Sequence, residues 1–212
     1  MAYVKTFYRP DGSEVDIYDT EDKDWWLQYG EQKEAAFLKF ARHHRLLPGI
    51  APNPVRAGGK NAGAPEFVYD GCPLDLKVQH QPFFEAERRY GIRPRFAVTL
   101  NYRDLRDIEE KYPDCNVVFW VNWIPTRYLK TEPRKKMSPK VIADISIAPL
   151  NGVWIATPQE LFKFEDEAIR AGTHHWYQRR HHDNKGNAKS SYVIDIRKLK
   201  LLWLDPTCEP LT

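Results

Sequence analysis

Residues 65–79, PEFVYDGCPLDLKVQ, read as two short strands joined by a tight turn. The central Asp70-Gly71 pair is typical of a two-residue hairpin turn, in which both positions need positive φ angles. With this turn, Glu66 on the first strand lies directly opposite Asp75 on the second. Opposed residues on one face of a hairpin have β-carbons about 5 Å apart. The stretch therefore predicts a hairpin that holds two carboxylates side by side.

The two faces of this hairpin differ in character. Because side chains alternate along a strand, Lys77 and Gln79 share the face of Asp75 and Glu66. Like charges this close repel each other, and a divalent cation would relieve the repulsion, since oxygen ligands suit Mg²⁺. A lysine that merely balances a surface carboxylate is the alternative. The opposite face is apolar and consists of Phe67, Tyr69, Leu74, Leu76 and Val78.

A helix is predicted over residues 24–45, with Asp24 as its N-cap. At 100° per residue, its apolar stripe includes Glu31 and Glu34. A carboxylate on a buried face is costly unless it has a cation or a hydrogen-bonding partner. An acid stabilised by the helix dipole is the alternative, although Glu31 already lies about two turns into the helix. We therefore expect a glutamate of this helix to face the hairpin.

The remaining patterns are those of further helices and strands. The stretch 48–64 is crowded with Pro and Gly, and loops of this length are usually functional or mobile. Residues 125–139 are basic and show no regular pattern. The expected elements are a hairpin turning at Pro10-Asp11-Gly12, helices over 83–91 and 102–112, strands over 95–100 and 116–123, a hairpin over 141–156 turning at Asn151-Gly152, a helix from the Thr157–Glu160 capping box to Gly172, and a last hairpin turning through 183–187.

This combination resembles the PD-(D/E)XK phosphodiesterase superfamily, which has the restriction-endonuclease-like fold. The matching segments are GEQKE at 30–34, Pro65-Glu66 and Asp75-Leu76-Lys77. The family usually has Asp at the first acidic position and Glu at the second, the reverse of the order here. The resemblance implies an α/β fold with an αβββαβ core and a mixed central sheet. We expect this core within residues 1–124, and a basic hairpin–helix–hairpin elaboration in 125–212 packed on it as one structural domain.

The resemblance also implies a chemistry for these residues. Glu66 and Asp75 would ligate Mg²⁺ or Mn²⁺, and Lys77 would orient or deprotonate the attacking water. Glu34, with Glu31 as the second choice, would hold the metal directly or through water. Gln79 would orient the nucleophile or a phosphate oxygen. The expected activity is metal-dependent hydrolysis of DNA phosphodiester bonds by an endonuclease.

The distribution of charge along the sequence indicates which kind of partner the protein binds. The formal net charge is only +3, but residues 170–200 hold eight Lys or Arg and residues 125–140 hold six. A basic half suits a polyanion such as double-stranded or branched DNA, and a solvated surface is the alternative. A two-fold dimer is expected if both strands are cut. The residues expected to contact nucleic acid are Arg56, Lys60, Arg134, Lys135, Lys136, Arg179 and Arg180.

Two other functions compete with this reading. The pairs His174-His175 and His181-His182, with Asp183 nearby, suggest a histidine-metal nuclease or a zinc site. Adjacent strand residues point to opposite faces, however, so each pair offers only one ligand to a site. The other competitor is a nucleic-acid-binding or structural protein on a nuclease-like fold, with its acids merely paired.

Composition limits the class of protein. Hydrophobic residues make up 42% of the chain and charged residues 29%, as in ordinary globular domains. The longest apolar run, VVFWV, is far shorter than the roughly 20 residues of a membrane span, so no membrane partner is expected. The first residues, MAYVKTFYRPDG, do not combine a charged region with a following apolar region, so no secretion signal is expected. Three cysteines without a CxxC motif indicate reduced thiols and a cytoplasmic, intracellular location.

Overall fold

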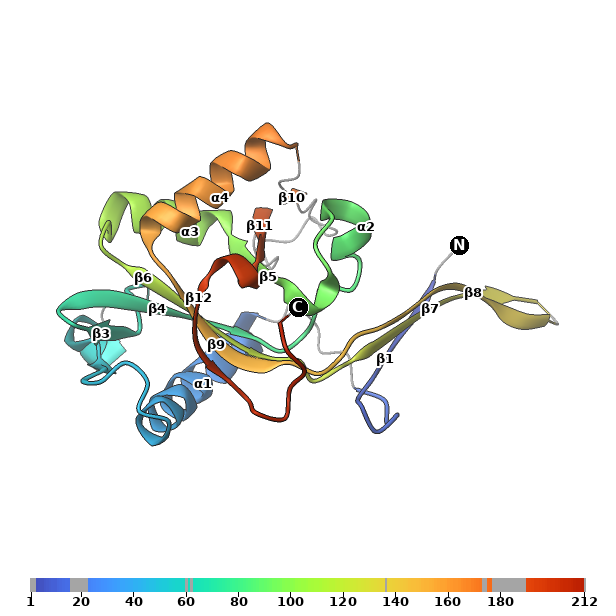
Figure 1. Cartoon of the computed structure of the whole chain (residues 1–212), viewed down its shortest axis with the longest axis horizontal. Coiled ribbons are helices and arrows are strands. Elements are labelled where there is room, and N and C mark those ends of the chain that lie inside the picture. The colour runs from blue at the N-terminus through green and yellow to red at the C-terminus, as the bar shows by residue number, and fades with distance from the viewer. Residues whose placement is uncertain are drawn as a thin grey trace.

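The computed structural model describes residues 3–15, 23–59, 61, 63–135, 137–172, 175–176 and 190–211. The protein has a mixed α/β fold built around a six-stranded sheet (Figure 1). In order across this sheet, the strands are β12 (Lys200–Leu204), β9 (Asn151–Ala156), β6 (Asn116–Asn122), β4 (Cys72–Gln79), β3 (Phe67–Tyr69) and β2 (Ala51–Pro52). The sheet is mixed, because β4 and β6 are parallel and the other neighbours are antiparallel.

The hairpin β3–β4 has the predicted register. Asp70 and Gly71 have φ angles of 50° and 78°, as a two-residue hairpin turn requires. Phe67 is paired with Leu74, and the ladder ends at this pair. The apolar face predicted for the hairpin is confirmed, since its side chains pack into one hydrophobic cluster together with Phe37.

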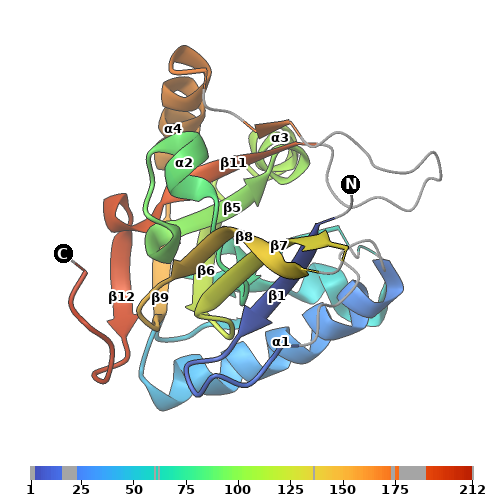
Figure 2. The ribbon, with the colours of Figure 1, turned by 90° about the vertical axis from the view of Figure 1, so that its right-hand side faces the viewer.

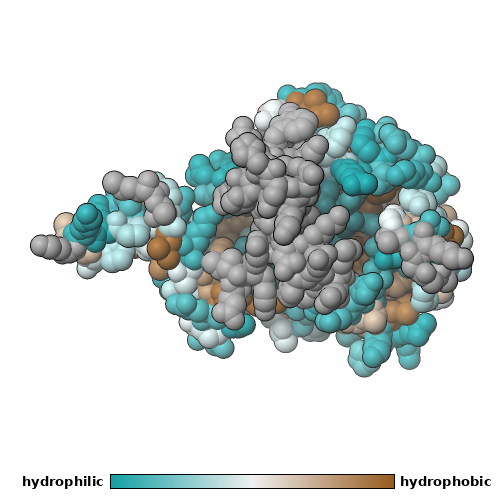
Figure 3. Space-filling view, turned by 180° about the vertical axis from the view of Figure 1, so that it is seen from behind, coloured by the Kyte–Doolittle hydropathy of each residue, from teal (hydrophilic) through white to brown (hydrophobic). Residues whose placement is uncertain are grey.

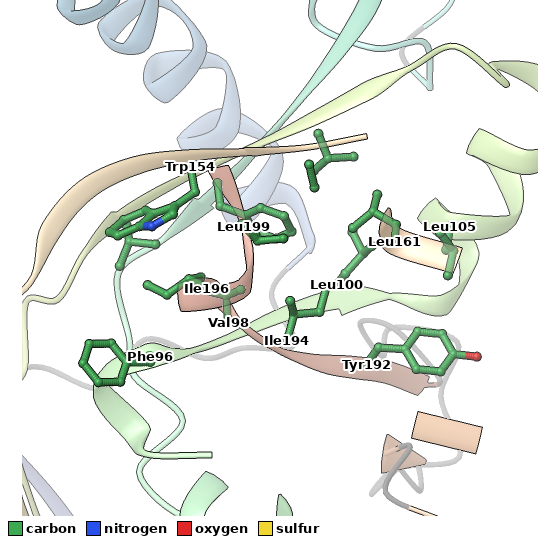
Figure 4. Packing of buried hydrophobic residues seen from close by; sticks show 14 of the residues in the cluster. Phe96, Val98, Leu100, Leu105, Trp154, Leu161, Tyr192, Ile194, Ile196 and Leu199 are labelled. Atoms are coloured by element: carbon green, nitrogen blue, oxygen red, sulfur yellow. The ribbon is translucent and has the colours of Figure 1, made fainter. Parts of the chain in front are cut away.

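Two layers cover the central sheet (Figure 2). Helix α1 (Lys23–His43) packs Phe37 and Ala41 against one face. The other face is covered by α3 (Tyr102–Lys111) and α4 (Pro158–Arg170), together with a small sheet of order β10-β11-β5. The strands of that sheet are β10 (His175–Trp176), β11 (Ser190–Asp195) and β5 (Ala97–Asn101). Figure 4 shows Ile196 and Leu199 beside Trp154 of the central sheet, with side chains of β5 and β11 continuing the main core from there.

A third sheet, of order β1-β7-β8, forms an arm that projects from the body (Figure 1). Its strands are β1 (Val4–Tyr8), β7 (Arg127–Arg134) and β8 (Met137–Ser146). At the base of the arm, Phe7 and Tyr128 pack on Phe84. The short helices are α2 (Ala86–Tyr90) and the 3₁₀ segments η1 (Pro54–Gly59), η2 (Pro94–Phe96) and η3 (Ile196–Lys198).

Several local predictions are confirmed. Thr157 and Glu160 form the reciprocal capping box at the start of α4, with Pro158 at the first helical position. Gly91 ends α2 in the left-handed conformation. All three cysteines are free thiols. Within the described part of the chain, no helix combines the length and apolar character that a membrane span needs.

Three predicted arrangements are wrong. Residues 125–139 are not irregular, because β7 and β8 form a hairpin there. The strand over 95–100 is not part of the central sheet, since β5 pairs with β11 instead. The hairpin over 141–156 does not exist, because β8 pairs with β7 whereas β9 pairs with β6 and β12. The first hairpin of the C-terminal elaboration is therefore wrong, whereas the strands of the last one pair as expected, His175 with Ser191 and Trp176 with Ser190. The central sheet extends across the boundary expected at residue 124.

Gly152 explains the last of these errors. It lies within β9, in an extended strand, and not at a turn. A β-carbon at this position would lie 2.5 Å from the Trp154 ring and 2.9 Å from the carbonyl oxygen of Trp203. The glycine of this Asn-Gly pair therefore permits close packing, and its resemblance to a turn signal is incidental.

Candidate active site

Glu66 lies just beyond the end of the β3–β4 ladder. Its Oε2 accepts a hydrogen bond of 2.8 Å from the backbone N–H of Leu76, so the glutamate side chain binds the neighbouring strand directly. Burial, followed by the negative charge of Asp75, raises the pKa of the Glu66 carboxyl. This influence is expected if the two acids share the face opposite α1. The hairpin therefore brings the two predicted carboxylates together.

Lys77 lies between two acids. Its Nζ is 2.9 Å from Oδ2 of Asp75 and 2.7 Å from Oδ2 of Asp104. Asp104 comes from the first turn of α3, which covers this face of the sheet. The three side chains are between 16% and 28% exposed, so the contacts are largely shielded from water. The lysine is thus fixed from both sides.

Arg56 connects α1 to the hairpin. Its Nη2 is 3.1 Å from Oε1 of Glu34, and its Nη1 is 2.9 Å from Oε1 of Glu66. The buried side chain of Asn53 fixes this loop, because its Nδ2 donates to the carbonyl of Pro65 at 2.9 Å. The backbone N–H of Asn53 also donates to the Glu66 carbonyl at 2.9 Å. The long Pro/Gly-rich loop therefore has an ordered segment that presents Arg56 to the acids.

We call these six side chains the charged cluster: Glu34, Arg56, Glu66, Asp75, Lys77 and Asp104. Four carboxyl groups face only two cations, so the cluster has a surplus of negative charge when all groups are ionised. Burial, followed by the charge of Asp75, raises the pKa of Glu66 to about 8. Burial, together with the charges of Glu31 and Asp75, also raises the pKa of Glu34 despite its contact with Arg56.

Lys77 and Cys115 titrate differently in this environment. Burial disfavours the Lys77 ammonium, but Asp75, Asp104 and Glu66 outweigh burial and raise its pKa. Lys77 is therefore a permanent cation near neutral pH. Burial, followed by the charge of Asp75, raises the pKa of the Cys115 thiol to about 12, so this cysteine is not a thiolate nucleophile.

The other predicted site residues have different surroundings. Glu31 is exposed on α1, so Glu34 is the helical acid that joins the cluster. Gln79 is held by β5, since its Nε2 donates to the Thr99 carbonyl at 3.1 Å. Arg134 and Lys135 are exposed on the arm. Outside the described residues lie Lys60, Lys136, Arg179, Arg180, His174, His181, His182 and Asp183, and the side chain of His175 is also not described.

The carboxylate oxygens of the charged cluster suit a hard divalent ion that takes only one or two of its ligands from the protein. Among the described residues, no group of three or more His, Cys, Asp or Glu is arranged to hold a metal ion. Mg²⁺, however, usually takes one or two carboxylates and fills its shell with water and phosphate oxygens. Glu66 and Asp75 supply two such carboxylates, and the surplus negative charge around them would be offset by a divalent cation. These residues therefore fit Mg²⁺ or Mn²⁺.

Sequence patterns missed two members of the cluster. Asp104 lies in the first turn of a helix, where an acid is favoured by the helix dipole, so nothing marked it as a partner of Lys77. Arg56 was predicted to contact nucleic acid, but its guanidinium binds Glu34 and Glu66. In the sequence, the excess of acids on the hairpin was the one indication that a cation from the adjacent loop would contact them.

The raised pKa of Glu66 predicts a pH dependence of stability. Between about pH 4.5 and pH 8 the folded protein retains a proton that the unfolded chain has released. The free energy of unfolding should therefore fall as pH rises through this range, measured by urea denaturation in EDTA. The partly buried His80, whose pKa is lowered, acts in the opposite direction, so the native protein is compared with Glu66→Gln, whose free energy of unfolding should fall less as pH rises. Glu87→Gln, on the exposed side of α2, should leave the profile unchanged. Equal profiles for Glu66→Gln and the native protein would contradict this assignment.

Removing Arg56 should destabilise the metal-free protein. In Arg56→Ala, Glu34 and Glu66 lose their shared cation in a shielded site, and we expect a loss of about 2 kcal/mol in the free energy of unfolding. The matched control is Arg127→Ala, which removes an exposed pair with Asp144 and should cost less. Denaturation of both variants in EDTA makes the comparison, and an equal or larger loss for the control would show that the Arg56 contacts contribute little.

No protein-family model, no curated protein and no solved structure matches this chain. The chemistry of the charged cluster therefore has to be argued from its own residues. These are two neighbouring carboxylates, a lysine held by two acids, and a helical glutamate joined to them through Arg56.

Proposed function

We propose that this protein is a divalent-metal-dependent deoxyribonuclease that hydrolyses DNA phosphodiester bonds as an endonuclease. The observation that carries the proposal is the charged cluster, in which Glu66 and Asp75 interact electrostatically beside a permanently charged lysine. Paired carboxylates with an adjacent fixed cation are suited to stabilising the charge of a phosphoryl-transfer transition state.

The order of the elements supports the same proposal. The elements α1, β2, β3, β4, α3 and β6 follow one another in the order expected of a restriction-endonuclease-like αβββαβ core, with α2 and β5 as an insertion before α3. The short strand β2, and not β5, then takes the first strand position. In this arrangement the acids lie on the central hairpin, and a glutamate comes from the first helix.

Glu66 and Asp75 are the residues that would hold Mg²⁺ or Mn²⁺, with Glu34 contributing directly or through water. When bound, the ion acts as a Lewis acid and lowers the pKa of its bound water. Glu66 must release its proton to act as a ligand, and its raised pKa means that this release is favoured by alkaline pH. The Leu76 N–H and the Arg56 guanidinium orient the Glu66 carboxylate.

Lys77 acts as a cation in this proposal and not as a base. Asp75 and Asp104 keep its ammonium charged, so it has no lone pair with which to remove a proton from water. It can donate hydrogen bonds to the attacking water or to a phosphate oxygen, and it can offset the negative charge that develops there. Of the two roles expected from the sequence, orientation of the water is the one these contacts favour.

Substitutions of Asp75 and Lys77 test the activity. We expect the native protein to cleave supercoiled, linear or branched DNA in Mg²⁺ or Mn²⁺. Asp75→Asn is nearly isosteric but lacks the charge that the metal needs, and Lys77→Ala lacks the cation beside the reacting phosphate. Each should lower the cleavage rate by about 100-fold or more. Asp166→Asn, on the exposed side of α4, is the control and should cleave normally. Undiminished cleavage by Asp75→Asn would refute the assignment of the site.

Thermal stability separates a metal site from a set of merely paired acids. A ligand that binds only the folded state raises the melting temperature, so Mn²⁺ should stabilise the native protein and Lys77→Ala but not Asp75→Asn. Differential scanning fluorimetry with and without EDTA makes the measurement. If Mn²⁺ has no effect and no DNA is cleaved, the acids are structural and the protein is better described as a nucleic-acid-binding module.

A further inference from the structure

The arm narrows to two strands at its tip among the residues that the structure describes. Strand β1 accompanies β7 as far as the Val4–Thr131 pair, and beyond this pair the described strands that pair are β7 and β8. The last pairs toward the tip are Glu132 with Lys140 and Arg134 with Met137. Figure 1 shows this ribbon extending away from the body, and Figure 3 shows it projecting with a mostly hydrophilic surface. The arm therefore exposes both faces of a two-stranded ribbon.

The arm carries a concentrated positive charge. Residues 127–146 contain six Lys or Arg against Glu132 and Asp144, an excess larger than the net charge of +3 for the whole chain. Arg127 is neutralised by Asp144, with hydrogen bonds of 2.8 and 2.7 Å. The exposed side chains of Arg134, Lys135 and Lys140, in contrast, form no ion pair with any residue that the structure describes. The free charge is thus gathered toward the tip.

This charge argues for a polyanion and against a second copy of the chain. Two such arms brought together would repel each other. The free edge strand β8 also carries Pro139 and Lys140, and the β7–β8 ladder is interrupted near Thr131 and near Arg134. Proline, lysine and irregular pairing are features that prevent strand edges from pairing with another chain. Charge complementarity is therefore the property that selects the partner.

The shape of the tip selects the form of the polyanion. The major groove of B-form DNA is about 12 Å wide and admits a two-stranded β-ribbon. The major groove of A-form RNA is too deep and narrow for side chains to read. Met137, which is 65% exposed, offers an apolar surface of the kind that contacts thymine methyl groups in the groove. We infer that the tip of the arm, residues 132–140, lies in the major groove of duplex DNA.

This inference rests on the proposed function only in taking DNA as the ligand. Figure 1 shows the β3 end of the central sheet and the arm at opposite ends of the molecule. The arm would therefore hold duplex DNA away from the cluster, and its contribution to binding can be measured without cleavage. When EDTA removes all divalent ions, DNA binding is measured without a metal ion at the charged cluster and without cleavage of the DNA.

Binding of a 40-base-pair duplex in EDTA tests the arm. The triple variant Arg134→Ala, Lys135→Ala, Lys140→Ala should bind about tenfold or more weakly at 0.1 M salt. The slope of log affinity against log salt should also become shallower by about 3, because three phosphate-neutralising groups are lost. The matched control neutralises three exposed lysines on other elements, Lys39, Lys163 and Lys200. An equal loss in this control would overturn the inference, because binding would then follow net charge and not the arm.

Two further measurements test the groove itself. DNA whose major groove is filled by glucosylated 5-hydroxymethylcytosine should bind the native protein as weakly as plain DNA binds the triple variant. A second variant, in which Asn-Gly replaces residues 131–142, closes the hairpin at the Lys130–Ala143 pair and should show the same loss with the body intact. Unchanged affinity for the filled groove, or an equal dependence on the arm for duplex RNA, would overturn the inference. Cleavage assays on Asp75→Asn test the proposed activity separately.

Discussion

The turn at Asp70-Gly71 is the constraint on which the rest of the site depends. Both residues have positive φ, which glycine accepts freely and aspartate tolerates better than most residues. A shift of one residue in the register would move every side chain of one strand to the opposite face. Asp75 and Lys77 would then point into the apolar layer under α1, where Phe37 and Leu74 now pack. The turn thus separates a face that packs on a helix from a face that carries the charged cluster.

The charged cluster shows what happens when more acids than cations share a shielded site. Burial makes each ionised carboxyl costly, and the nearest opposite charges are already shared, since Arg56 serves Glu34 and Glu66 and Lys77 serves Asp75 and Asp104. Burial, followed by the negative charge of Asp75, accordingly raises the pKa of Glu66. Without a further cation, the carboxyl groups of this site are not fully neutralised. The same excess of acids therefore affects both the stability of the protein and the proposed binding of a metal ion.

Local signals predicted local structure well. The hairpin register, the capping box at Thr157 and the helix end at Gly91 depend on residues close in sequence, and all three are confirmed. The errors concern pairings that depend on distant residues. Nothing near residues 97–101 indicates that their partner is β11, about ninety residues later, and Gly152 is explained only by the ring of Trp154 and the carbonyl of Trp203. The same limit applies to the site, where Lys77 was found from the hairpin but its second partner, Asp104, lies on a helix.

The charged cluster and the arm carry charges of opposite sign. A phosphate approaching the cluster meets surplus carboxyl charge, so the cluster repels DNA in the absence of a cation. A phosphate approaching the arm meets Arg134, Lys135 and Lys140, which need no cation to attract it. In the proposed function, DNA binding and hydrolysis would therefore belong to separate parts of one chain. Such a division allows a protein to hold a long polyanion at a distant surface while the site that would cut it depends on a metal ion.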